Sequence, residues 1–208
     1  MVVDGGSTDG TVEWLREQPD VELIVQTLPL TGAVVAFNLG FARAIDLGAR
    51  FVMQANDDMI LESREAFAVA IEHMNKHPRV GAVAFGYDLY CPGRFACSYY
   101  AGKPYVNFGV IRREAGEAVA RAQGDPTGRA WWWNPIYRTY GADTEFGIHM
   151  WRLGWEIAAM PELRVKDLNA QDELRKINRG DGSVISPDST LFFERWRDFS
   201  FEAAVKPA

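Results

Sequence analysis

The sequence is poor in cysteine and histidine, and it contains neither a long apolar run nor a long basic one. Its 208 residues include two cysteines, Cys91 and Cys97, and three histidines, so we expect no disulfide framework and no Cys/His zinc site. Since no run of about 18 apolar residues occurs, we expect no membrane-spanning helix. The N-terminus lacks the segments of a signal peptide. These absences predict a cytoplasmic protein, with peripheral contact to the inner face of a membrane as an open alternative.

The charge and the composition limit the partners. The formal net charge is −6, whereas a protein that binds DNA or RNA normally carries a basic face, so we expect no nucleic-acid partner. The chain is 48% hydrophobic and 12% aromatic, which is enough apolar material for a sizeable core. We therefore expect a folded domain, and the composition does not indicate its oligomeric state.

Strand-like and helical segments alternate in the first part of the chain. Such alternation predicts a parallel sheet covered by helices. The segment 88–110 is rich in Tyr, Gly and Pro and predicts irregular structure or antiparallel strands, and no linker divides the chain. The expected strands are 1–4, 21–27, 51–55, 80–85 and 155–159, and the expected helices are 8–17, 32–47, 63–76, 112–123, 142–153 and 189–199.

Two acidic loops follow predicted strands. Asp4 begins one loop, and Asn56, Asp57 and Asp58 form the other. In parallel α/β sheets, ligands bind beyond the carboxyl ends of the strands, so one shared site is expected there. The oxygens of Asn56 and Asp58 suit Mg²⁺ or Mn²⁺, which often takes its other ligands from substrate phosphates. A solvated turn is the alternative for residues 56–58, and a turn or helix-capping acid is the alternative for Asp4.

The glycines of the first loop predict close approach of a ligand to the backbone. Gly5 and Gly6 follow Asp4 directly, and Ser7 comes next. The sequence has neither a Walker motif nor a Gly-x-Gly-x-x-Gly motif. A phosphate-bearing ligand would therefore have to be held through a metal.

Acidic residues and tryptophans mark the predicted acceptor side. Asp143 and Glu145 open a predicted helix, where acids are favoured anyway, but where a general base could also stand. Three consecutive tryptophans, residues 131–133, cannot all face one core from a single strand or helix. They predict either a stacking platform for a sugar ring or a lipid carrier, or a loop that packs over the core.

In this order, the motifs resemble those of the family 2 glycosyltransferases with the GT-A fold. Residues 3–11 match the signature Val-Asp-x-Gly-Ser-Thr-Asp-Gly-Thr, and residues 32–40 match Gly-x-x-x-Ala-x-Asn-x-Gly. Residues 56–58 resemble the metal motif, and 143–145 with 152–155 resemble the acidic helix that follows it. The resemblance implies an α/β GT-A domain, a Rossmann-like sandwich with a mostly parallel central sheet, over residues 1–165. Residues 166–208 would form a C-terminal extension packed on that domain.

The resemblance also implies a reaction and a role for each residue. A single sugar would move from a nucleotide-diphospho-sugar donor to a hydroxyl of a saccharide or lipid-linked acceptor, with inversion and with Mn²⁺ or Mg²⁺ as cofactor. Single transfer is expected because Phe192 stands where a processive synthase has Gln before Arg-Trp. The implied catalytic base is Asp143; the metal ligands are Asp58 and Asn56; the nucleotide-binding residues are Asp4, Gly6, Ser7, Asn38 and Asp57; and the acceptor-binding residues are Trp132, Trp133 and Glu145.

The sequence also departs from the family. The strand and helix that precede the Val-Asp signature in the family are missing ahead of Asp4, which favours the alternative of a truncated, non-catalytic nucleotide-binding remnant. A histidine often found soon after the position of Pro161 is absent, and Asp167 is a nearby substitute. A nucleotidyltransferase is a third class, but the glycine-rich basic N-terminal loop expected of it is not present.

Overall fold

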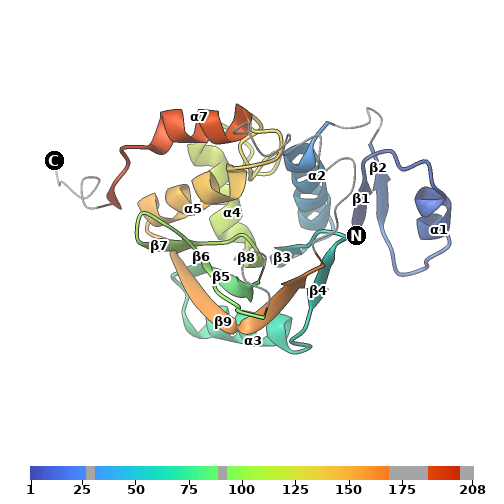
Figure 1. Ribbon diagram of the computed structural model, residues 1–208, viewed down its shortest axis with the longest axis horizontal. Helices are drawn as coiled ribbons and strands as arrows, with labels where there is room; N and C mark the ends of the chain where they lie inside the picture. The colour runs from blue at the N-terminus through green and yellow to red at the C-terminus, as the bar shows by residue number, and fades with distance from the viewer. Residues whose placement is uncertain (27–30, 89–92, 169–186, 202–208) are drawn as a thin grey trace.

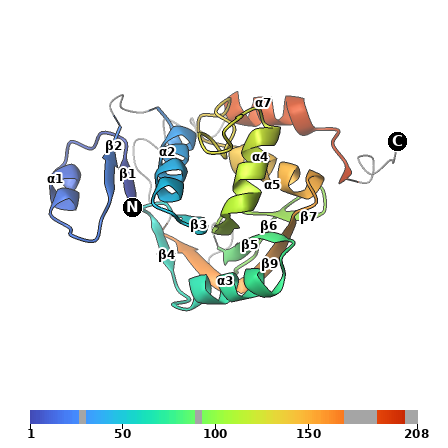
Figure 2. The same ribbon diagram turned by 180° about the vertical axis from the view of Figure 1, so that it is seen from behind.

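The protein forms a mixed five-stranded sheet with helices on both faces, as seen in a computed structural model that describes residues 1–26, 31–88, 93–168 and 187–201. In Figure 1, α3 (Ala66–Lys76) lies on one face of the sheet. On the other face lie α2 (Ala33–Asp46), α4 (Arg113–Ala122) and α5 (Ala142–Arg152), with α7 (Pro187–Trp196) outermost. Figure 2 shows the same layers from behind.

The strand order is β3-β8-β5-β9-β4. The pairs β3–β8, β8–β5 and β9–β4 are antiparallel, and β5–β9 is parallel. The sheet is therefore mixed, and the prediction of a mostly parallel sheet needs correction. The bounds are β3 Phe51–Gln54, β4 Met59–Leu61, β5 Val80–Tyr87, β8 Gly109–Arg112 and β9 Glu156–Asp167.

The edge strand β4, antiparallel to β9, is one reason for the mixed sheet, and β8, which returns between β3 and β5 in the opposite direction, is the other. Its first residue, Gly109, has φ 152°, and a Cβ there would lie 1.9 Å from the carbonyl oxygen of Val83 on β5. Only glycine fits at this point, and it brings β8 close enough to pair with β5. The alternation along β8 then places Ile111 against the helices α2, α4 and α5 and Val110 against α3.

The N-terminal unit is a separate small sheet. The strand β1 (Val2–Asp4) pairs in parallel with β2 (Leu23–Val25), and α1 (Thr11–Arg16) connects them. Neither strand joins the five-stranded sheet among the residues described. Another two-stranded sheet pairs β6 (Ser98–Tyr100) with β7 (Lys103–Tyr105), in agreement with the antiparallel alternative predicted for 88–110.

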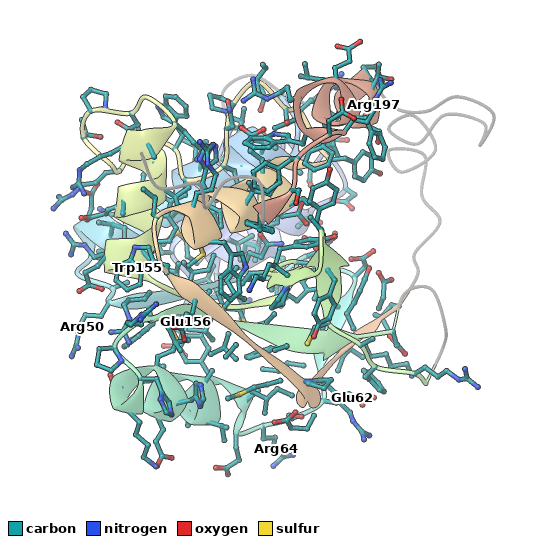
Figure 3. The ribbon with its side chains drawn as sticks, turned by 90° about the vertical axis from the view of Figure 1, so that its left-hand side faces the viewer. Arg50, Glu62, Arg64, Trp155, Glu156 and Arg197 are labelled. Atoms are coloured by element: carbon teal, nitrogen blue, oxygen red, sulfur yellow. The ribbon has the colours of Figure 1, made fainter. Side chains whose placement is uncertain are left out.

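The long strand β9 bends, and the bend decides what lies beside the metal-motif turn. The strand starts at Glu156 and crosses the molecule towards Glu62, as Figure 3 shows. Its register against β5 shifts where Gly86 faces the carbonyl of Pro161, 2.3 Å from the Cβ position of Gly86. Bulges of this kind redirect a strand. Beyond the bend, β9 pairs with β4, and its last residue, Asp167, is paired with Met59.

Candidate active site

Asp4 stabilises its own loop. The carboxylate is buried, and Oδ1 accepts hydrogen bonds from the backbone N–H groups of Gly6 and Ser7, at 2.8 Å each. The Ser7 hydroxyl donates to Oδ2 at 2.8 Å. Burial alone would raise the pKa of Asp4, but these hydrogen bonds outweigh it and hold the pKa below its ordinary value. Gly6 has φ 101°, so the loop needs glycine there. The loop is thus preformed around an ionised carboxylate.

The predicted metal motif forms the turn between β3 and β4. Asn56 and Asp57 are exposed, and Asp58 is buried. The carbonyl of Asp58 accepts a hydrogen bond from the Leu168 N–H at 2.8 Å, so Asp58 lies beside the end of β9. The neighbouring Asp167 accepts a hydrogen bond from the Tyr87 hydroxyl at 2.7 Å. The turn that carries Asp58 and the end of β9 that carries Asp167 are therefore neighbours.

The side-chain oxygens of Asn56, Asp57 and Asp58 suit a hard divalent cation only if the cation has other ligands as well. Within the described ranges, no three Asp, Glu, His or Cys side chains are grouped as a ready-made metal site. Mg²⁺ is commonly held by one or two carboxylates together with substrate phosphates. Asp58 matches that pattern, and Asp167 is the nearest second acid along the β4–β9 pair.

Asp143 is the second residue of α5 and is half-buried. Burial raises its pKa above the ordinary value, although the N–H of Thr144 at 2.7 Å and the Thr144 hydroxyl at 3.3 Å act in the opposite direction. A carboxylate with a raised pKa binds a proton more readily, which is the property that a general base needs. Among the predicted site residues with a resolved shift, only Asp143 is perturbed in this direction.

Glu145 occupies a different environment from Asp143. Its side chain is fully buried and accepts five hydrogen bonds, from Asn134, Tyr137, Arg195 (two) and Trp196. With all of its accepting positions directed at protein donors, this carboxylate is not available to an acceptor. The predicted role of Glu145 in acceptor binding does not fit this placement.

The tryptophan run packs into the core, as the alternative prediction has it. Trp132 is fully buried and stacks on Phe41 at 5.1 Å between ring centroids, and Trp133 is 4% exposed and lies 4.7 Å from the Phe37 ring. Neither ring leaves a face open to a sugar, so the predicted acceptor contacts of Trp132 and Trp133 do not fit either. Trp131 is only partly buried and remains available.

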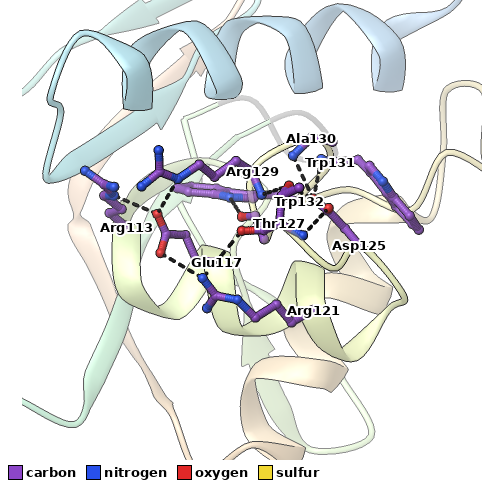
Figure 4. A network of polar contacts seen from close by, with 10 residues as sticks. Arg113, Glu117, Arg121, Asp125, Thr127, Arg129, Ala130, Trp131 and Trp132 are labelled. Carbon is purple, nitrogen blue, oxygen red and sulfur yellow. Dashed lines mark hydrogen bonds and ion pairs between the residues drawn. The ribbon is translucent and has the colours of Figure 1, made fainter.

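Two carboxylates shape the loop that carries these tryptophans, as Figure 4 shows. Asp125 is 1% exposed and accepts hydrogen bonds from the N–H groups of Thr127, Ala130 and Trp131 and from the Thr127 hydroxyl. On the other side of Trp132, Glu117 forms ion pairs with three arginines: Arg113, Arg121 and Arg129.

Asn38 connects α2 to the same loop. Its amide nitrogen donates to the Trp133 carbonyl at 2.8 Å, and its amide oxygen accepts the Trp133 N–H at 3.0 Å. Asn38 is buried. Because both ends of the amide are used in this way, Asn38 acts in the structure as a connection between elements and does not present its amide to a nucleotide.

The predicted site residues thus form three groups on separate elements. Asp4, Gly6 and Ser7 form the first, the 56–58 turn forms the second, and the first turn of α5 forms the third. The two acidic loops do not share one sheet edge as predicted, since β1 and β3 belong to different sheets. The link between them is α2, which contacts both β1 and β3.

A cavity of about 550 Å³ lies away from all three groups, where β5 and β9 begin. It lies next to the C-terminal ends of α3 and α5, where basic side chains are favoured by the helix dipole. Its charged and aromatic lining consists of His73, His77, Arg79, Lys103, Trp151, Trp155 and Glu156.

The sequence did not identify the partners of Glu145. Two of these partners, Arg195 and Trp196, stand out in the sequence only by comparison with the synthase signature. Asp188, at the other end of α7, does not stand out at all, although it accepts hydrogen bonds from the backbone N–H groups of residues 138–140. A short helix that begins with Pro-Asp and ends with Arg-Trp was the available signal.

Comparison with known proteins finds a similar fold among solved structures. No protein-family model and no curated protein matches the chain. Among solved structures, S. aureus TarS is similar, with a TM-score of 0.53 and 14% sequence identity; the match covers 97% of this chain and 38% of the TarS chain. No helix within the described residues has the length and apolar character to cross a membrane. The fold of this chain is thus similar to that of 38% of the TarS chain.

Proposed function

We propose that the protein is a metal-dependent inverting glycosyltransferase of family 2 type that transfers one sugar from a nucleotide-diphospho-sugar to an acceptor hydroxyl. The observation that carries the proposal is Asp143: a partly buried carboxylate with a raised pKa at the start of α5, on a glycosyltransferase-like fold. Such a group binds a proton more readily than an ordinary carboxylate does, as a general base must.

In the proposed reaction, Asp143 accepts the proton of the acceptor hydroxyl. The acceptor oxygen then bonds to the anomeric carbon while the bond from that carbon to the diphosphate oxygen breaks, so the configuration inverts and a nucleoside diphosphate leaves. Mn²⁺ or Mg²⁺, held by Asp58 with Asn56 and Asp57 nearby, would supply Lewis-acid stabilisation of the leaving diphosphate. Asp4 would accept a hydrogen bond from the nucleotide base, and Gly6 and Ser7 would line its approach.

The acceptor is a saccharide or a lipid-linked hydroxyl in this proposal. Of the three tryptophans, Trp131 is the one with exposed surface, next to Leu39 and Pro135 around a hollow of about 190 Å³. We therefore assign acceptor stacking to Trp131 in place of Trp132 and Trp133. An aromatic face beside apolar side chains can hold the apolar face of a sugar ring.

A non-catalytic nucleotide-binding remnant is the second candidate. Asn38 is used by the Trp133 backbone, and the Asp4 loop lies outside the main sheet. Both features reduce the number of groups that face a nucleotide.

Thermal unfolding with nucleotides tests the proposal. We expect UDP, GDP or dTDP together with Mn²⁺ to raise the Tm of the intact protein, and Asp58→Ala to remove that rise. Asp20→Ala, at an exposed position in the loop after α1, is the control and should keep it. If no nucleotide shifts the Tm, the hypothesis that the protein is a glycosyltransferase is wrong. If a nucleotide shifts the Tm but no nucleotide-sugar is turned over, the protein is a non-catalytic nucleotide-binding remnant.

A further inference from the structure

Glu145 joins three separate segments of the chain. Its Oε1 accepts hydrogen bonds from Asn134 at 2.8 Å and from Arg195 Nη2 at 3.0 Å. Its Oε2 accepts from the Tyr137 hydroxyl at 2.6 Å, from Arg195 Nε at 3.0 Å and from the Trp196 indole N–H at 2.5 Å. The loop before α5, the first turn of α5 and the end of α7 therefore meet at one carboxylate.

The other end of α7 is attached to the same loop. Asp188, the second residue of α7, accepts the backbone N–H groups of residues 138–140, with the shortest distance, 2.6 Å, to Thr139. Between these two attachments, Phe192 packs against Gly141, where a Cβ would lie 3.2 Å from the Phe192 Cβ. Both ends and the middle of α7 thus contact the segment that leads into α5 or the first turn of α5 itself.

Helix geometry relates this attachment to Asp143. Side chains two residues apart on an α-helix point about 200° apart around its axis. Glu145 therefore anchors one side of the first turn of α5, and Asp143 projects from the opposite side. Any rotation of this turn that moved Asp143 would break the hydrogen bonds of Glu145.

The groups that meet at Glu145 (Tyr137, Arg195, Trp196 and Asn134, with His149 nearby) keep their charge states near neutral pH. Burial would raise the pKa of Glu145, but its hydrogen bonds from Arg195, Tyr137, Trp196 and Asn134 hold the pKa below its ordinary value. Burial and Glu145 raise the pKa of Tyr137. Burial lowers the pKa of His149, whose Nε2 lies 3.9 Å from Glu145, so this histidine is neutral at pH 7. Glu145 and Tyr137 therefore keep their ordinary charge states near neutral pH.

We propose that Glu145 is a positioning residue that holds Asp143 in place through its bonds to Arg195 and Trp196 of α7. This proposal rests on the proposed function, because it assigns Asp143 the role of base. The Arg195 side chain is 37% exposed, whereas Glu145 is fully buried. Such a pair adds little net stability, but its directional bonds fix orientation. The arrangement makes α7 part of the acceptor side of the site.

Kinetics of Glu145→Gln and Arg195→Gln test the proposal, with Arg197→Gln as the control. Arg197 follows α7 and lies at the exposed outer end of the molecule in Figure 3. We expect the first two variants to keep the nucleotide-induced Tm rise and the donor KM but to lose about 100-fold in kcat, the size of loss that a small misplacement of a reacting group causes. Arg197→Gln should behave like the parent protein. Arg195→Lys should not restore kcat, since one ammonium cannot bond both carboxylate oxygens in the same way.

A double variant separates positioning from general loss of structure. If Glu145 acts through Asp143, then Asp143→Asn with Glu145→Gln should be no slower than Asp143→Asn alone. Losses that multiply, or an unchanged kcat in folded Glu145→Gln, would overturn the proposal. Should Glu145→Gln not fold, Arg195→Gln serves in the same cycle.

A readout that needs no substrate distinguishes this proposal from the proposed function. The pKa of Asp143 can be measured by ¹³C NMR of the carboxyl carbon. We expect Glu145→Gln and Arg195→Gln to bring it down towards the ordinary value, because a loosened first turn admits water, and Arg197→Gln to leave it in place. If the parent turns over no nucleotide-sugar, the proposed function fails; if the pKa of Asp143 is the same in all variants, the positioning proposal fails.

Discussion

Gly116 lies directly beneath the indole ring of Trp132, and a Cβ on Gly116 would come within 2.5 Å of two ring atoms. Trp132 belongs to the loop between α4 and α5, the tryptophan loop. Helix α4 therefore lies so close to this loop that a methyl group on Gly116 would have no room. Because Trp132 is fully buried and also stacks on Phe41, its ring has no open side towards which it could shift. The contact fixes the loop against both α4 and α2.

We accordingly expect Gly116→Ala to destabilise the protein by about 1–3 kcal/mol, the usual cost of overpacking a core. Alanine is the better helix former by up to about 1 kcal/mol, so the sign of the change reports the clash. Urea unfolding measures it. Ala122→Ser, which also adds one heavy atom but at an exposed position of α4, should change stability by no more than about 0.5 kcal/mol. A Gly116→Ala protein as stable as the parent would mean that Trp132 is not held in the core.

The burial of the tryptophan loop could not be settled from the sequence alone. Three tryptophans in a row are visible in the sequence, but their burial depends on Gly116 and Phe41, which are remote from the loop in the sequence. Glu145 is a similar case: an acid in the first turn of a helix has the same local pattern whether it faces water or an arginine 50 residues away. Contacts between distant segments decide such roles, and the sequence pattern does not encode them.

Elements with a strong local pattern were predicted more closely. The helix expected over 142–153 is observed at Ala142–Arg152, and the strand expected over 80–85 is observed at Val80–Tyr87. The position of β8 between β3 and β5 was not predicted, since strand order depends on which edges remain to be paired. Together with β4, which is antiparallel to β9, this strand makes mixed a sheet that alternation predicted as parallel.

A second prediction concerns Asp125, whose carboxylate holds the start of the tryptophan loop. Burial would raise its pKa, but hydrogen bonds from the Thr127 hydroxyl and from the backbone N–H groups of Ala130, Thr127 and Trp131 hold the pKa below 3.8. A folded-state pKa below the unfolded value gives stability that is present above the unfolded pKa and is lost as pH falls through the folded pKa. Asp125→Asn should therefore cost about 2–4 kcal/mol at pH 7, and the loss should shrink as pH falls below about 3.8.

The matched control for Asp125 is Asp9, which makes the same Asp-x-Thr contacts on the surface. Its Oδ1 accepts hydrogen bonds from the N–H of Thr11 at 3.1 Å and from the Thr11 hydroxyl at 2.6 Å, but the residue is exposed. Asp9→Asn should cost much less than Asp125→Asn in urea unfolding at pH 7. Equal losses would show that burial of Asp125 adds nothing.

The last prediction concerns the pH dependence of stability at Asp143. Burial raises the pKa of this carboxyl, so the folded protein holds its proton more tightly than the unfolded chain. The neutral form is favoured by folding, and the parent protein loses stability as pH rises from about 3.8 through the folded pKa. Asp143→Asn cannot lose that proton. It should therefore be more stable than the parent at pH 7, with an advantage that disappears near pH 3, as measured by Tm across the pH range.

The same variant separates function from stability. If Asp143 is the base, Asp143→Asn should keep the Tm rise caused by nucleotide and Mn²⁺ but lose sugar transfer, so that a more stable protein is an inactive one. Asp20→Asn, at an exposed position, should change neither property. A lower Tm of Asp143→Asn at pH 7 would show that the charged carboxylate is stabilised by a partner in the folded protein, and undiminished turnover would remove Asp143 from the role of base. A carboxylate that costs stability where it stands and is needed for transfer is the pattern expected of a group held in place for chemistry.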